Sequence, residues 1–145
     1  MTAAATYFED VKVGDVEVTP AMTLTEAHAA LYRGLTSEGP DGAGVIPDLL
    51  PLCLSTGLGW RTPRAPLAVL AFMSIDWKIH RELRVGETIH GRARAALKRS
   101  MREGGVIIEE HEVIDQNGDV AQSGRFIFLV AKRSAAHPAA PAPTA

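Results

Sequence analysis

Hydrophobic residues near the start of the chain recur at helical spacing. Thr23 is placed as an N-cap, and Glu26, three residues on, would complete a capping box. An apolar stripe then follows on one side of the predicted helix, formed by Ala27, Ala30, Leu31 and Leu35. Because Gly39 and Pro40 interrupt the pattern, we expect an amphipathic helix that ends before them.

A second helix is predicted over residues 49–58, where leucines fall on every side of the helical wheel. Asp48 is placed to cap its N-terminus, and Pro51 lies in the first turn, where its missing N–H costs nothing. A helix that is apolar all round is normally buried. We therefore expect a long buried central helix, preceded by a glycine-rich loop that carries Glu38 and Asp41.

The rest of the chain predicts β-strands, at residues 15–20, 67–77, 87–97, 106–115 and 119–132. Asn117-Gly118 lies between the last two and signals a type I′ hairpin. His90 and His111 alternate with charged neighbours, which predicts that both lie on exposed strand faces. The economical arrangement is an α+β fold in which a curved antiparallel sheet wraps around the central helix.

Composition narrows the class of protein. The 145 residues suit one domain, predicted at residues 7–133, between a flexible N-terminus (1–6) and a disordered Ala/Pro-rich tail (134–145). The net charge of −2 and the lack of a basic run argue against nucleic-acid binding. Residues 49–58 are too short, and too broken by Pro51 and Gly57, to span a membrane.

Motifs for metals and cofactors are missing from the sequence. We find no CxxC, HExxH, GxGxxG, P-loop or GxSxG pattern, so neither a metal site nor a cofactor is predicted. The single cysteine, Cys53, excludes an internal disulfide. No secretory signal is recognised, and we therefore expect a cytoplasmic protein.

Several short motifs occur in a fixed order along the chain. They are YFEDVKVGD at residues 7–15, LTEA at 24–27, VIP and LL at 45–50, WKIH and VGET at 77–88, and GDV with SGR at 118–125. In this order they resemble the hotdog fold and, within it, the MaoC-like (R)-specific enoyl-CoA hydratase/dehydratase group. The resemblance covers residues 7–131.

The resemblance implies a lyase that adds water to, or removes it from, an acyl thioester carried by coenzyme A or a carrier protein. It also implies a homodimer or a higher homo-oligomer. In this group the catalytic loop usually reads S-G-D-x-N-P-x-H, and its Asp and His move the proton. Here the matching stretch, residues 36–42, reads TSEGPDG, with Glu38 at the Asp position and no histidine after it.

The predicted catalytic residues are therefore carboxylates. Glu38 and Asp41 would act as base and partner, since a carboxylate in a water-poor pocket can transfer protons near neutral pH. Asp48, with the free N–H groups of the second helix, would support the thioester carbonyl oxygen. The predicted substrate-binding residues are His28, Leu49, Cys53, Trp77 and His80.

Each of these residues also has a purely structural interpretation. Glu38 and Asp41 would then belong to a polar surface loop, Asp48 would only cap a helix, and Cys53 would be a small core residue. His28 would be a half-exposed helix residue.

Two other functions stay open from the sequence. A catalytically silent subunit paired with an active partner would explain the missing loop histidine. A repurposed hotdog thioesterase or a biosynthetic cyclase/dehydratase would need only a single loop acid.

Overall fold

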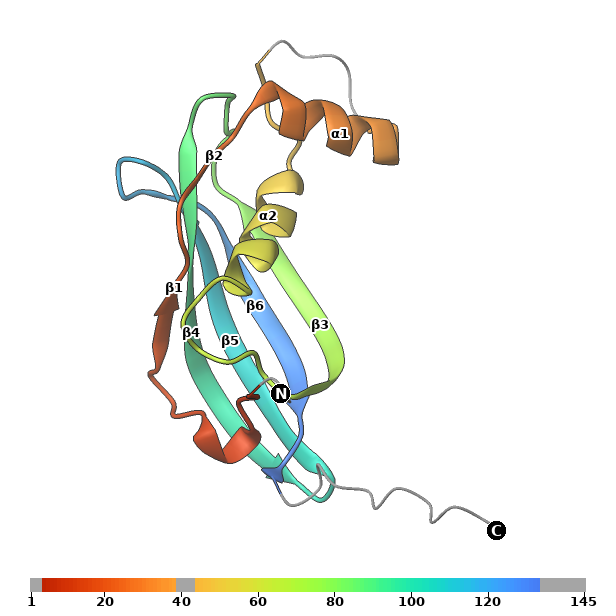
Figure 1. The fold of residues 1–145 in the computed structure, drawn as a ribbon, viewed down its shortest axis with the longest axis vertical. Coiled ribbons are helices and arrows are strands. Elements are labelled where there is room, and N and C mark those ends of the chain that lie inside the picture. The colour runs from red at the N-terminus through yellow and green to blue at the C-terminus, as the bar shows by residue number, and fades with distance from the viewer. Residues whose placement is uncertain (1–3, 39–43, 134–145) are drawn as a thin grey trace.

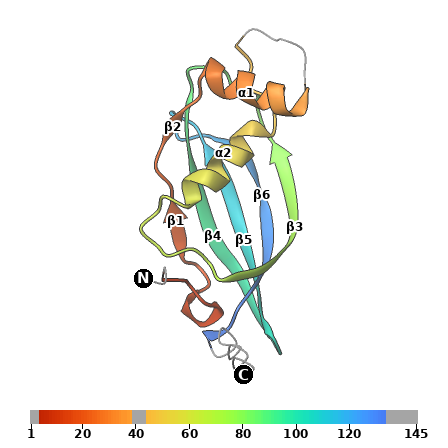
Figure 2. The same ribbon diagram turned by 45° about the vertical axis from the view of Figure 1, so that its right-hand side comes forward.

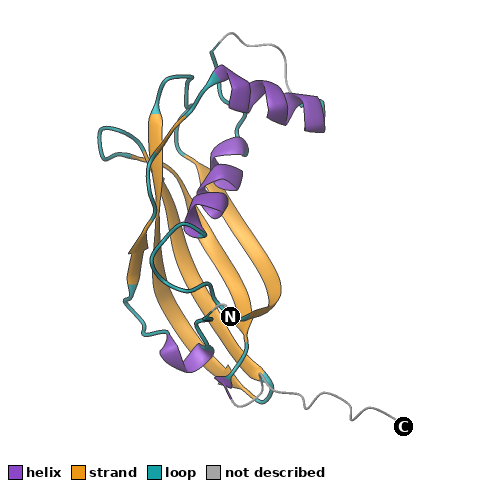
Figure 3. Ribbon diagram, viewed as in Figure 1, coloured by secondary structure: helices purple, strands orange, loops and turns teal. Residues whose placement is uncertain are grey.

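The computed structural model describes residues 4–38 and 44–133, which form one curved antiparallel sheet with helices on its concave side (Figures 1 and 3). Five of the six strands run in the order β1-β4-β5-β6-β3, and the sixth, β2, pairs with the first residues of β4. Their bounds are β1 Val16–Val18, β2 Met22–Thr23, β3 Val69–Ile79, β4 Thr88–Met101, β5 Gly104–Ile114 and β6 Val120–Val130. The α+β prediction, with an antiparallel sheet curved around a helix, is confirmed.

The central helix, α2 (Leu50–Gly59), lies on the concave face of the sheet, as the turned view shows (Figure 2). It buries Leu50, Pro51, Ser55 and Leu58. The opposite side of α2 is open, and Cys53 is exposed, so the predictions of a long, wholly buried helix and of a buried cysteine are wrong. The sheet covers only one side of this ten-residue helix.

The first helix, α1 (Glu26–Thr36), lies across one end of the sheet, beyond the start of α2 (Figure 1). Its N-cap is Thr25, because Thr23 is already paired with Thr88 in the β2–β4 ladder. The predicted apolar stripe points away from the core, with Leu31 67% and Leu35 79% exposed. Since α1 overhangs the sheet, only Ala29 and Tyr32 reach the packed interior.

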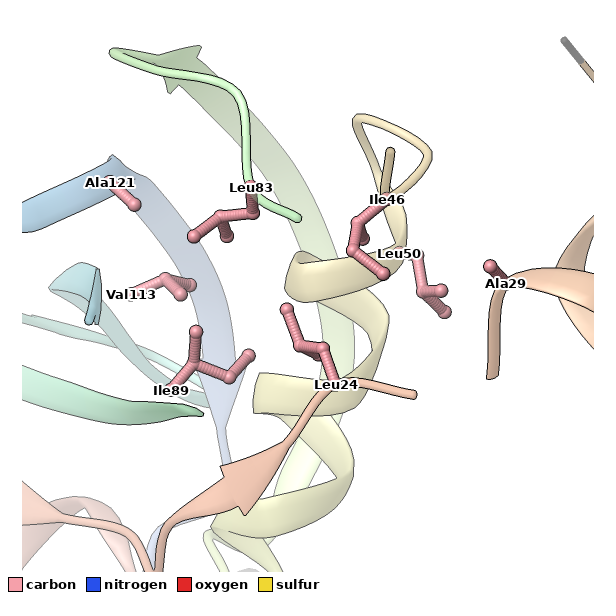
Figure 4. Packing of buried hydrophobic residues seen from close by; sticks show 8 residues of the cluster. All are labelled: Leu24, Ala29, Ile46, Leu50, Leu83, Ile89, Val113 and Ala121. Atoms are coloured by element: carbon pink, nitrogen blue, oxygen red, sulfur yellow. The ribbon is translucent and has the colours of Figure 1, made fainter. Parts of the chain in front are cut away.

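The main core sits where both helices meet the end of the sheet (Figure 4). Its members come from both helices, from β4, β5 and β6, and from connecting segments: Leu24, Ala29, Ile46, Leu50, Leu83, Ile89, Val113 and Ala121. A second cluster closes the opposite end beside the 3-10 helix η1 (Phe8–Asp10), and consists of Phe8, Val11, Ala95, Ile107 and Val130. The sheet between the two clusters is free to line a cavity.

The β5–β6 hairpin occurs where it was predicted, but its turn is not type I′. That turn needs a positive φ at both central residues, and only Gly118 has one (φ 83°). The Asp115 carboxylate accepts the N–H groups of Asn117 (2.8 Å) and Asp119 (3.0 Å). These bonds hold Asn117 in an ordinary backbone conformation and tighten the turn around Asp115.

Both chain ends were predicted to be loose. Thr6 is held, because its N–H donates to the Pro66 carbonyl (2.8 Å) and its hydroxyl to that of Ala65 (2.6 Å). The flexible N-terminus at residues 1–6 stays a prediction. The predicted tail, residues 134–145, lies outside the described residues.

Candidate functional site

A cavity of about 480 Å³ lies between the second half of α2 and the concave face of the sheet. Small residues make room for it: Gly91 and Ala93 on β4 line it beside Ser55 of α2. A Cβ at Gly91 would stand 2.5 Å from the Ser55 hydroxyl oxygen, so a larger residue there would force the Ser55 side chain to move. A space of this size is typical of a small-molecule site.

Aromatic rings form the inner wall of the cavity. Phe72 of β3 and Phe126 and Phe128 of β6 all line it. The Phe72 and Phe126 rings pack edge to face, with centroids 5.5 Å apart, and Phe72 and Phe128 are 5.2 Å apart. Aromatic pairs of this geometry form rigid apolar surfaces that suit flat apolar groups.

A polar pair projects from β5 into this wall. Nε2 of His111 lies 2.8 Å from Oε2 of Glu109, and the two side chains are only 20% and 17% exposed. The His111 ring stacks on Phe126, with centroids 3.9 Å apart. The prediction that His111 lies on an exposed strand face is therefore wrong, because odd-numbered residues of β5 face the helix.

The other charged residues of the cavity are Glu17, Arg64 and Arg92. Each is engaged with another side chain; their respective partners are Thr62, Asp15 and Glu112. Glu109 is therefore the charged group that orients His111 within the described cavity.

The predicted loop residues gather at the opposite end of α2. The nearby Glu38 carboxylate, assisted by burial, raises the pKa of Tyr32 to about 12, and the charges of Cys53 and Asp48 act in the same direction. Glu38, Asp48 and Cys53 thus all affect the pKa of the Tyr32 phenol on α1. All three are exposed, and Asp41 lies outside the described residues.

Asp48 does not cap α2 as predicted. The N-cap is Leu49, itself exposed, and no side chain accepts from the helix start. The Asp48 carbonyl instead accepts from Nε2 of Gln122 (2.7 Å), whose Oε1 accepts from the Trp77 indole (2.9 Å). This chain of bonds ties the start of α2 to β6 and β3, and it places Trp77 beside the core.

The two predicted histidines lie apart from one another. His28 Nδ1 lies 3.0 Å from both the backbone nitrogen and the hydroxyl of Thr25, so this side chain caps α1. His80 is exposed, with Nε2 2.7 Å from the Ser123 hydroxyl. Neither of them lines the cavity.

The sequence analysis missed Glu109 and His111 as functional candidates. The signal available was the small residue opposite His111 on β4, since Ala93 pairs with His111 and lines the cavity. Residues 4–38 and 44–133 contain no group of three potential metal ligands. Nor does a helix in these two stretches have both the length and the hydropathy to cross a membrane. The cytoplasmic location stays a prediction.

Comparison with known proteins supports a fold but not a family. Neither a family model nor a curated protein sequence matches the chain. A monoamine oxidase regulatory protein from Archaeoglobus aligns with a TM-score of 0.81 and 21% identity, over 91% of this chain and 99% of that one. A MaoC-like dehydratase from Rhodospirillum rubrum aligns with a TM-score of 0.74 and 13% identity, over 88% and 97%.

A third solved structure, from Mycobacterium tuberculosis, has a double hotdog fold. It aligns with a TM-score of 0.69 and 20% identity, over 97% of this chain and 53% of that chain. This chain has the hotdog fold. It spans about half of the double hotdog protein, and α2 is the central helix of its single hotdog unit.

Proposed function

We propose that this hotdog protein is a hydratase/dehydratase-type lyase that acts on an acyl thioester. The observation that carries the proposal is the apolar cavity between α2 and the sheet, which offers an acyl group a place out of water. The Rhodospirillum rubrum neighbour, a MaoC-like dehydratase, supports the same class of chemistry. In the dehydration direction a base removes the proton next to the thioester carbonyl and the 3-hydroxyl leaves as water, giving the enoyl thioester.

The proposed proton-transfer groups are the loop carboxylates Glu38 and Asp41. Asp48 and the N–H groups at the start of α2 would stabilise the negative charge on the carbonyl oxygen. The raised pKa of Tyr32 supports this arrangement, because Glu38 and Asp48 both contribute to it. The reacting carbons would lie near these carboxylates, and the acyl tail would extend along α2 toward the cavity.

The proposed substrate contacts surround the start of α2. Leu49 and Cys53 are exposed on that helix and would contact the thioester arm. His28 would contact it from α1. Trp77 and His80, at the end of β3 and just beyond it, would border the acyl group.

We also propose that two copies pair along β3. This strand is an edge of the sheet, yet its apolar side chains are exposed: Val69, Leu70, Phe72, Met73, Ile75 and Ile79. An apolar edge of this length invites pairing with a second sheet. The double hotdog neighbour supports the proposal, since two such units share one chain there. Phe72 also lines the cavity, so a second copy would border the site.

Turnover of crotonyl-CoA tests the proposed activity. Hydration consumes the conjugated enoyl thioester, and its ultraviolet absorbance falls without release of a thiol. We expect the purified wild type to catalyse this reaction, and Glu38→Gln or Asp41→Asn to lose about 100-fold in kcat. Glu103→Gln, an exposed acid between β4 and β5, is the matched control and should keep full activity.

Two outcomes would contradict the proposal. Release of free thiol would indicate a thioesterase. Lack of any turnover, with crotonyl-CoA still bound, would indicate a subunit without catalytic activity of its own.

A further inference from the structure

Glu109 and His111 occupy a sheet face that otherwise forms the core. On the same face of β5, Ile107 and Val113 are fully buried. Burying a carboxylate and an imidazole costs free energy, and a well-packed apolar pair is often at least as stable in such a place. Folding alone therefore gives little reason for a polar pair here, and a bound group provides one.

The direction of the hydrogen bond decides what the pair can bind. A carboxylate only accepts, so Nε2 of His111 carries the proton and donates to Glu109. In the neutral ring Nδ1 is then left as an acceptor. Among the described residues, every buried side-chain polar atom has a partner, whereas Nδ1 of His111 has no protein partner there and is therefore not buried. Nδ1 is accessible from the cavity and can accept a hydrogen bond from a bound donor.

The walls around this acceptor suit a ring. Phe126 fixes the plane of His111 by stacking, and Phe72 and Phe128 complete an aromatic lining around it. The cavity of about 480 Å³ is roughly three times the ~150 Å³ that holds one benzene. It therefore accommodates a ring, the atoms that connect the ring to a thioester, and bound water.

The position along α2 agrees with a substrate of that length. The cavity begins at Ser55, five residues after Leu50, which is a rise of about 8 Å along the helix. An unsaturated acyl group that ends in a substituted ring spans this distance when its thioester lies at the start of α2.

We propose that the cavity binds an acyl group ending in an aromatic ring with a hydroxyl, and that His111, oriented by Glu109, accepts a hydrogen bond from that hydroxyl. A hydroxyl supplies such a donor without bringing a charge into an apolar space. The inference rests on the proposed function and deepens it, because it names the substrate class of the same site. Glu109 and His111 are specificity-determining residues in this scheme, and the proton-transfer groups stay at the other end of α2.

Two matched probes test the inference: the N-acetylcysteamine thioesters of 4-hydroxycinnamic acid and of cinnamic acid. Calorimetric titration of the wild type should show about tenfold tighter binding of the hydroxylated probe, the value expected for one well-oriented hydrogen bond. His111→Phe keeps a ring to stack on Phe126 but removes Nδ1, so the preference should fall to about twofold or less. His90→Phe, on β4 and outside the cavity lining, should keep it.

Nitrogen NMR of the wild type gives a second readout that does not depend on the variant folding. The hydroxylated probe should shift Nδ1 of one histidine, and the unsubstituted probe should not. Equal affinity for both probes, binding of neither, or a preference that survives His111→Phe would overturn the inference. Turnover is scored separately: tight binding of the hydroxylated thioester without hydration would contradict the proposed lyase and leave the ring-hydroxyl inference standing.

Discussion

Three charged side chains hold the turn end of the sheet together, and replacing one of them gives the sharpest stability prediction. Nη2 of Arg81 lies 2.6 Å from Oε1 of Glu87 and 2.6 Å from Oδ2 of Asp115. The Asp115 side chain is only 1% exposed. Asp115→Asn keeps the shape, and its oxygen can still accept the two turn N–H groups, but it removes the charge that faces Arg81.

The expected cost follows from what remains after the substitution. Removing one partner of a buried ion pair usually costs about 3–5 kcal/mol. Arg81 keeps Glu87 and is about one-third exposed, so the cost falls below this range, and we expect a loss of about 2–3 kcal/mol. For a chain of this size the loss corresponds to a decrease in Tm of about 5–10 °C.

The effect should depend on pH with a definite sign. Hydrogen bonding to Arg81 lowers the pKa of Asp115, and it lowers the pKa of Glu87 to about 2. A carboxyl whose pKa is lower in the folded state stabilises the fold above its unfolded pKa, here about 4 to 4.5. That contribution is lost as the pH falls toward the folded value. The difference between wild type and Asp115→Asn should therefore shrink below about pH 4.

Urea unfolding followed by circular dichroism measures the free energy of unfolding across this pH range. Glu112→Gln is the control, since it breaks an exposed pair with Arg92 and should cost less than about 1 kcal/mol. A loss below about 0.5 kcal/mol for Asp115→Asn at neutral pH would refute the reasoning. So would a difference that stays constant down to about pH 2.5, because the ion pair would then not be its cause.

Three further predictions concern packing, electrostatics and assembly. Gly105→Ala should destabilise the fold by about 1–3 kcal/mol in thermal unfolding, because its Cβ would collide with the buried ring of Phe8; a loss within experimental error would contradict that contact. In Glu38→Gln the pKa of Tyr32 should fall from about 12 toward 10 in a spectrophotometric titration, and an unchanged titration would mean that Glu38 does not act on this phenol. Met73→Asp should convert the proposed β3-paired dimer to a monomer in light scattering at micromolar concentration, and a monomeric wild type would exclude the dimer altogether.

Local sequence signals predicted the strands and the hairpin, and tertiary contacts determined the exact strand ends and the type of turn. The strand that was expected at residues 67–77 begins at Val69 and continues to Ile79, because it pairs with β6 from Val130 to Gln122. The turn at Asn117-Gly118 lies at the predicted position, but hydrogen bonds to the Asp115 carboxylate stabilise a different turn type. Pairing partners that lie far away in the sequence decide such shifts, and a single segment carries no information on them.

For the helices too, the sequence predicted their location, and the tertiary structure decided which side is buried. Periodicity located α1, yet the side expected to be buried carries the exposed Leu31 and Leu35. The pattern shows that one side of a helix is apolar, whereas the position of the sheet decides which side is covered. For the candidate site, Glu38, Asp48 and Cys53 were predicted near one helix start, and all three contribute to the raised pKa of Tyr32. Their catalytic and binding roles stay predictions.

The sequence by itself determined the order of helices and strands, the hairpin, the sheet curved around a central helix and the region that carries the loop acids. These depend on residue periodicity and on turn chemistry, which act over a few neighbours. Only the tertiary structure decided that Glu109 and His111 face inward, because Ile107 and Ile108 left the two faces of β5 equivalent in the sequence. The curvature of the sheet and the small residues Gly91 and Ala93 of β4 leave the cavity in front of this pair, and several strands have to come together to form it.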